Sequence, residues 1–141
     1  MKKCALLSIA VLLSACTAVD VKEVDSSHKI DHVCIENNPK VIVADFVSTV
    51  EDVFQSHGIT TEIYSGKIPT HCVFNLTYTA LQSWDFSTYL SHAELRLFKG
   101  RERIGYAEYH LKGKGGFALN KWASVKSKMT PVVNQLLAQQ K

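Results

Sequence analysis

The chain has 141 residues, of which 16 are Lys or Arg and 13 are Asp or Glu, and its formal net charge is +3. This length is enough for one domain with one hydrophobic core. The near balance of charge argues against a nucleic-acid binder, which usually carries a concentrated basic surface.

The N-terminus has the pattern of a bacterial secretory signal. Lys2 and Lys3 precede an apolar run, Cys4–Leu13, which is shorter than the roughly 20 residues of a membrane-spanning helix. The tetrapeptide Leu13-Ser14-Ala15-Cys16 that ends the run resembles a lipobox, in which the Cys is acylated and becomes the mature N-terminus. We therefore predict a signal peptide over residues 1–15 and a lipid on Cys16.

Processing at this site would change the composition of the chain. Removing residues 1–15 leaves 126 residues with 14 basic and 13 acidic side chains, a formal charge of +1. Thr17 rather than Asp follows the acylated Cys16, and by resemblance to bacterial sorting signals this favours the outer membrane, with the domain facing the periplasm. Residues 16–29 are polar and are predicted to be the acylated Cys and a flexible tether, and residues 30–141 a single globular domain.

Two cysteines remain after processing, Cys34 and Cys72. An even pair in an oxidising compartment favours a disulfide. The competing interpretation is a metal site, because His32 lies near Cys34 and His71 precedes Cys72. Adjacent residues of a strand point to opposite faces, so these four ligands would not converge without a bulge, and we expect the disulfide.

Hydrophobic periodicity predicts two helices and about five strands. The first helix is expected over residues 40–57, with Asn38 as its cap and Gly58 as its end. The second starts near Leu119 and contains Pro131, so that it either kinks or restarts there. The strands are expected at 31–36, 60–64, 72–83, 89–98 and 103–111. The order β-α-β-β-β-β-α predicts an α+β two-layer sandwich, a mostly antiparallel sheet with both helices on one face.

The last two strands form a predicted hairpin with a polar face. A three-residue loop would place Lys99 opposite Arg103 and bring two imidazoles and two carboxylates together: His92, Glu94, Glu108 and His110. Like charges directly opposite each other destabilise a sheet, and a divalent cation would neutralise them. The alternative is a hydrated polar face, and a shift of one residue in the register would scatter the four side chains.

An aromatic-rich segment joins two of the predicted strands. Trp84, Asp85 and Tyr89 lie in it and are candidate partner contacts, since Trp and Tyr are enriched at interfaces. The alternative is that these aromatic side chains cap the core.

The usual catalytic motifs are missing from the sequence. It contains no paired-His zinc motif, nucleophile elbow or phosphate loop. The glycine-rich segment 112–116 could hold an anion but lacks the spacing of a nucleotide loop, and we expect a strand-to-helix connection there. We therefore predict a non-enzymatic protein without a cofactor.

Several segments together carry a family resemblance. The lipobox, Val33-Cys34-Ile35-Glu36, Tyr78-Thr79-Ala80, Ser83-Trp84-Asp85 and the run from Gly105 to Gly116 resemble those of a family of small uncharacterised Gram-negative lipoproteins. The resemblance implies an anchored periplasmic α/β domain and brings no catalytic residue with it. We expect an envelope protein that binds another envelope protein or polymer; the alternative is a metal-binding protein that uses the hairpin cluster.

Overall fold

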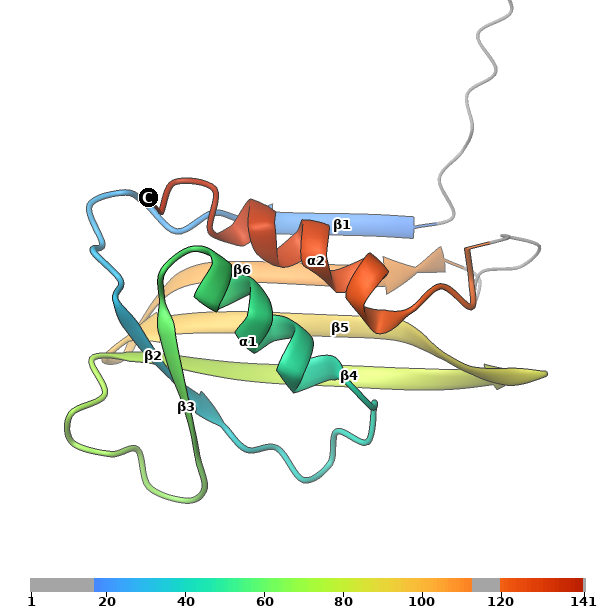
Figure 1. Ribbon diagram of the computed structural model, residues 1–141, viewed down its shortest axis with the longest axis horizontal. Coiled ribbons are helices and arrows are strands. Elements are labelled where there is room, and N and C mark those ends of the chain that lie inside the picture. Colours follow the sequence, from blue (N-terminus) through green and yellow to red (C-terminus); the bar gives the residue numbers. More distant parts are fainter. Residues whose placement is uncertain (1–16, 113–119, 141) are drawn as a thin grey trace, which may run out of the picture.

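The structure is a computed structural model, and it describes residues 17–112 and 120–140. The predicted signal peptide, Cys16 and residues 113–116 of the glycine-rich segment lie outside these ranges. The described part is α+β, with six strands in one sheet and two helices on one face of it (Figure 1). In chain order the elements are β1 (Thr17–Lys22), β2 (His32–Glu36), α1 (Phe46–Ser56), β3 (Thr60–Tyr64), β4 (Phe74–Asp85), β5 (Ser87–Lys99), β6 (Glu102–Leu111) and α2 (Val125–Leu136).

The sheet is mixed, with strand order β1-β6-β5-β4-β2-β3. β2 runs parallel to both β3 and β4, and the other neighbours are antiparallel. Parallel neighbours need a crossover connection, which α1 supplies between β2 and β3. The predicted α+β class is thus confirmed, while the expected five-stranded, mostly antiparallel sheet differs from the observed one by the added β1 and the parallel end.

The prediction of a flexible tether is wrong for the beginning of the described chain. β1 pairs with β6 along its whole length, and Val24 beyond it is fully buried. An edge strand needs only one hydrogen-bonded neighbour, and β1 is half-buried or exposed along its length. Because β1 has no fully buried apolar face, its sequence lacks an apolar cluster from which a strand could be predicted.

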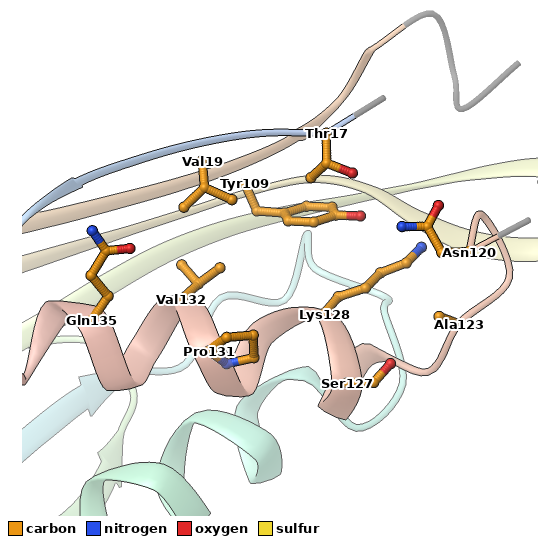
Figure 2. Close-up of a pocket in the computed structure, with 10 residues that line it drawn as sticks. All are labelled: Thr17, Val19, Tyr109, Asn120, Ala123, Ser127, Lys128, Pro131, Val132 and Gln135. Carbon is orange, nitrogen blue, oxygen red and sulfur yellow. The ribbon is translucent and has the colours of Figure 1, made fainter. Parts of the chain in front are cut away.

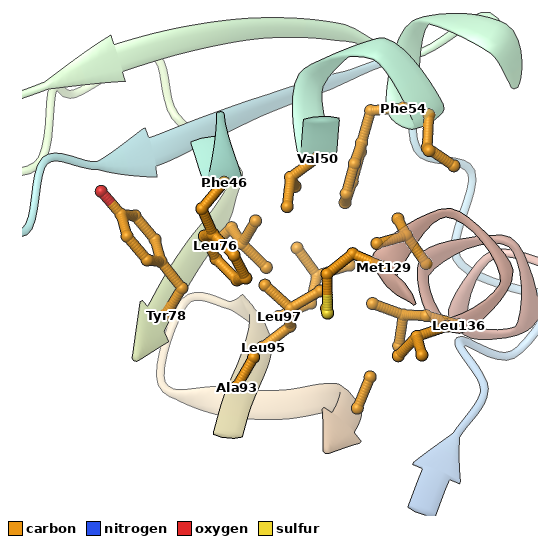
Figure 3. Packing of buried hydrophobic residues seen from close by; sticks show 14 of the residues in the cluster. Phe46, Val50, Phe54, Leu76, Tyr78, Ala93, Leu95, Leu97, Met129 and Leu136 are labelled. Carbon is orange, nitrogen blue, oxygen red and sulfur yellow. The ribbon is translucent and has the colours of Figure 1, made fainter. Parts of the chain in front are cut away.

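The hydrophobic core lies between the two helices and the sheet. Figure 3 shows Phe46, Val50 and Phe54 of α1 facing Leu76 of β4, beside Leu95 and Leu97 of β5 and Met129 and Leu136 of α2. All of these side chains are buried. Burying one side chain of this size stabilises a fold by about 1.5–3 kcal/mol, so the periodicity of the helices reflects their main source of stability.

Both helices differ from expectation at one point. α1 begins at Phe46 rather than at residue 40, and its N-cap is Asp45, so the prediction of Asn38 as the cap is wrong. The side-chain oxygen of Asn38 instead accepts from the N–H of Lys40 in a turn. Its amide group also donates to the carbonyl oxygen of Tyr78, which holds this segment on the sheet. α2 is one helix that continues through Pro131.

In the described part of the chain, the helices leave the second face of the sheet open. The side chains directed there are mostly polar, and they include both groups of His and Glu residues considered below. None of the described helices is long and apolar enough to cross a membrane.

Candidate functional sites

The predicted register of the β5–β6 hairpin is confirmed at the polar cluster. His92 lies opposite His110 and Glu94 opposite Glu108. The loop itself is one residue shorter than expected, since Lys99 pairs with Glu102. A register shift at Leu97/Phe98 compensates for the missing residue.

The hairpin cluster brings three of its four predicted side chains into close contact. His92 Nε2 lies 3.1 Å from Glu94 Oε1, and His92 Nδ1 lies 3.8 Å from Glu108 Oε1. One potential ligand atom from each of these three residues lies within 4.8 Å of the others. His110 contacts the cluster through its Nδ1, 3.3 Å from His92 Nδ1, but its side chain is exposed.

Two residues that the sequence analysis missed complete the hairpin cluster. Arg96 forms an ion pair with Glu94, and the hydroxyl of Tyr106 donates to Glu108 Oε2 at 3.0 Å. Each lies two positions from the carboxylate that it contacts, on the same strand and face, and this period of two could have found them. Burial, followed by the hydrogen bond to Glu108, raises the pKa of Tyr106. The guanidinium of Arg96 therefore supplies positive charge beside Glu94, the role that the predicted metal ion was expected to have.

A second cluster lies at the parallel end of the sheet. Cys34 and Cys72 form the predicted disulfide, with a Cα–Cα distance of 5.9 Å, so neither thiolate is free for a metal. Their neighbours His32 and His71 instead face Glu62.

Glu62 is the centre of this second cluster. Its Oε2 lies 2.9 Å from His71 Nε2 and 3.5 Å from His32 Nε2. The hydrogen bond from His71 holds the pKa of Glu62 below its ordinary value. No sequence pattern indicated Glu62, because its position follows from the parallel register that pairs it with Cys34.

The end of the β4–β5 hairpin and Trp122, which precedes α2, form an exposed aromatic tip, which we define as Trp84, Phe86 and Trp122. These side chains are 74%, 89% and 46% exposed. Asp85 fixes the tip to the rest of the domain, since its carboxylate pairs with Lys121 and its carbonyl oxygen accepts from Trp122 Nε1 at 2.8 Å.

The three predicted partner-contact residues have different positions. Trp84 is exposed and Asp85 is partly exposed, whereas Tyr89 is buried and 5% accessible. The ammonium groups of Lys121 and Lys128 lie 5.6 and 5.7 Å from the centre of its ring. Tyr89 therefore belongs to the core, as the alternative interpretation expected, and the prediction missed Phe86 and Trp122.

A pocket of about 520 Å³ lies between β1 and α2 (Figure 2). Tyr109 and Lys128 point toward its end at Thr17 and Asn120, and Val132 lies along its side. Burial lowers the pKa of Lys128 and raises the pKa of Tyr109. The ten residues that line the pocket include no carboxylate, imidazole or thiol: Thr17, Val19, Tyr109, Asn120, Ala123, Ser127, Lys128, Pro131, Val132 and Gln135.

The described chain is therefore an α+β domain with a polar open face, an exposed aromatic tip and a mainly apolar groove. No protein-family model and no curated protein matches it in sequence. Its fold is similar to solved structures of the PelC dodecamer from Paraburkholderia phytofirmans. The structure in space group P6 has a TM-score of 0.57 at 9% identity and covers 88% of this chain and 98% of that chain.

A variant of the same dodecamer in space group C2 gives a TM-score of 0.55, again at 9% identity, with 88% of this chain and 96% of that chain covered. Identity this low makes the similarity one of fold alone.

Proposed function

We propose that this protein is a lipid-anchored component of the bacterial envelope, attached through Cys16 and facing the periplasm from the outer membrane. Its domain is a non-enzymatic binding module whose contact surface is the aromatic tip. The observation that carries the proposal is the exposure of two large aromatic side chains, Trp84 and Phe86, on the turn of a long hairpin.

The aromatic tip and the proposed anchor lie at the same end of the sheet (Figure 1). Thr17, the first described residue, pairs with Leu111, and the neighbouring His110 pairs with His92. β5 begins at Ser87, five residues before His92, so the hairpin extends about 16 Å beyond this row at 3.3 Å per residue. A partner that contacts the tip would therefore lie close to the membrane that holds Cys16.

The backbone at the tip supports a binding role. Phe86 has φ of 59°, a conformation that bulky residues rarely adopt, and its ring is almost wholly exposed. Strain held at an exposed position without a packing gain is typical of functional sites. Aromatic side chains on a rigid support are also typical anchors of protein interfaces, so we infer that the partner is a protein.

The other sites favour binding over catalysis. In the pocket between β1 and α2, the hydroxyl of Ser127 and the ammonium of Lys128 donate to backbone carbonyl oxygens rather than to each other. In the hairpin cluster, Arg96 and Tyr106 already contact the two carboxylates, which weakens the case for a metal held by His92, Glu94, Glu108 and His110. That alternative predicts a change in melting temperature with EDTA or zinc that is lost in His92→Ala.

The similarity of fold to the PelC dodecamer makes a second copy of this chain the first protein partner to test. Light scattering coupled to size exclusion would measure the mass of the purified protein. A mass of several chains that falls in Trp84→Ala would assign the aromatic tip to self-association, whereas a monomer would leave another envelope protein as the partner.

Crosslinking in intact cells tests the binding role. A photoreactive amino acid at position 84 or 86 should give a discrete protein adduct, and one at Val73 serves as a control. Val73 is 58% exposed but precedes β4, at the opposite end of that strand from Trp84. Adducts to lipid alone would show that the tip contacts the bilayer, and equal adducts from all three positions would refute a specific surface. For the anchor, Cys16→Ser should abolish acylation and membrane fractionation.

A further inference from the structure

We propose that His32, Glu62 and His71 form a binding site for a divalent transition-metal ion, with Zn²⁺ as the ion to test. The three residues come from β2, β3 and the connection between β3 and β4. They lie on the open face of the sheet at its parallel end, away from the aromatic tip, so the inference is independent of the proposed function.

The hydrogen bonds of Thr60 fix the orientation of His32. The hydroxyl of Thr60 donates its only proton to the carbonyl oxygen of Asp31 at 3.1 Å. With its proton directed there, the hydroxyl accepts from His32 Nδ1, which lies 2.7 Å away. In the neutral imidazole this network assigns the proton to Nδ1 and leaves a lone pair on Nε2. A partner that sets the tautomer through the second nitrogen is the usual support of a metal-binding His.

The lone pair of His32 points at a carboxylate. In this tautomer His32 Nε2 and Glu62 Oε2, 3.5 Å apart, are both acceptors, so a cation or a proton is needed to join them. Among the ion pairs of the described residues, those of Glu62 involve only His32 and His71, with no Lys or Arg. The hairpin cluster differs on this point, since Arg96 already pairs with Glu94 there.

The spacing of the three atoms suits a tetrahedral ion. Ligands at roughly 2.0–2.1 Å from Zn²⁺ lie about 3.3 Å from each other in this geometry. The observed separations of 2.9 Å and 3.5 Å lie on either side of this value, and the potential ligand atoms are all within 4.8 Å of one another. Two imidazoles and one carboxylate leave a fourth position for water. The side chains are 33%, 40% and 60% exposed, so an ion can reach them from solvent.

The disulfide positions the third ligand. Cys72 directly follows His71 and is bonded to Cys34, which pairs in register with Glu62. The connection between β3 and β4 is thereby fixed to the strand that carries His32. The cysteines thus act through the placement of an imidazole rather than as ligands.

Titration calorimetry with ZnCl₂ tests the site. The protein is expressed as the full chain, purified without a polyhistidine tag and stripped with EDTA. We expect one Zn²⁺ per chain, loss of this binding in Glu62→Gln and in His71→Ala, and affinity reduced roughly 10–100-fold in Thr60→Val, which keeps all three ligands. Zinc should raise the melting temperature of the unaltered protein but not of Glu62→Gln. Circular dichroism without zinc verifies that each variant is folded.

The matched control is His92→Ala, which removes an imidazole from the hairpin cluster and should bind Zn²⁺ like the unaltered protein. Absence of zinc binding would overturn the proposal. So would binding that survives in both Glu62→Gln and His71→Ala, or binding that is lost in His92→Ala instead.

Discussion

The backbone N–H of Val24 donates a hydrogen bond to the carbonyl oxygen of Leu136, 3.0 Å away, and both side chains lie over Gly105. A Cβ added to Gly105 would lie 2.7 Å from Val24 Cγ2 and 3.0 Å from Leu136 Cδ1. A close approach of this kind leaves no room for any larger residue. The glycine of β6 therefore lets the N-terminal segment and the end of α2 close on the sheet.

Gly105→Ala should lower the free energy of unfolding by about 1–3 kcal/mol, the usual cost of overpacking a buried site. Urea denaturation measures the change. In the double variant Val24→Ala/Gly105→Ala the added methyl group occupies space that the smaller residue vacates, so the loss should be less than the sum of the two single losses. Strict additivity would show that the two residues do not contact each other in the way described.

Features set by residues close together in the sequence could be predicted, whereas features set by pairing between distant residues could not. The pairing of His92 with His110 could be predicted because the strands are joined by a short hairpin, and it holds because the shift at Leu97/Phe98 compensates for a loop one residue shorter than expected. Glu62 could not be assigned to a site, because a parallel register between β2 and β3 depends on how α1 packs and no turn sets it.

The edge strand β1 was missed for a related reason. Its stability comes from pairing with β6 and from the burial of Val24, both of which join residues more than 80 positions apart in the chain. The core itself was predictable, since its helical stripes repeat every three or four residues.

The disulfide between Cys34 and Cys72 should leave no free thiol among residues 17–141 when the unfolded, unreduced protein is titrated. The bond closes a loop of 38 residues, and removing this constraint should lower the free energy of unfolding by about 3–4 kcal/mol in the chain-entropy model. Cys34→Ala/Cys72→Ala compared with the unaltered protein in urea measures this loss. Two titratable thiols in the native protein would contradict the pairing.

Lys128 should make stability depend on pH. Its side chain is buried, and its ammonium donates to the carbonyl oxygens of Leu90, at 3.0 Å, and Lys121. Burial lowers the pKa of Lys128 in the folded state. Between the folded and unfolded pKa values the unfolded chain binds more protons, so the free energy of unfolding rises with pH across that window.

The test of this dependence is the slope of stability against pH between about 8 and 10, below the pKa of an unfolded Lys. Lys128→Met keeps most of the length of the side chain but cannot titrate, so it should show a smaller rise than the unaltered protein. The range ends near pH 10 because Tyr109, whose pKa burial raises, acts in the opposite direction above it. Equal slopes in the two proteins would contradict the assignment to Lys128.

Phe86→Gly should separate stability from binding at the aromatic tip. The residue has φ of 59° and is 89% exposed, so its replacement relieves backbone strain and loses almost no buried surface. A left-handed conformation costs a bulky residue about 1–2 kcal/mol, part of which the entropy of Gly offsets, and the free energy of unfolding should rise by up to about 1 kcal/mol. Crosslinking of the partner from position 84 should fall at the same time, because the most exposed ring of the aromatic tip is gone.

The matched control for this change is Trp84→Gly, which also replaces an exposed aromatic side chain of the tip. Trp84 has no positive φ, so the substitution relieves no strain and should lower the free energy of unfolding by about 0.5–1 kcal/mol. Crosslinking to the partner from position 86 should fall here as well. A loss of stability in Phe86→Gly equal to that in Trp84→Gly would show that the Phe86 ring packs against the domain, and the tip would then be a structural cap rather than a binding surface.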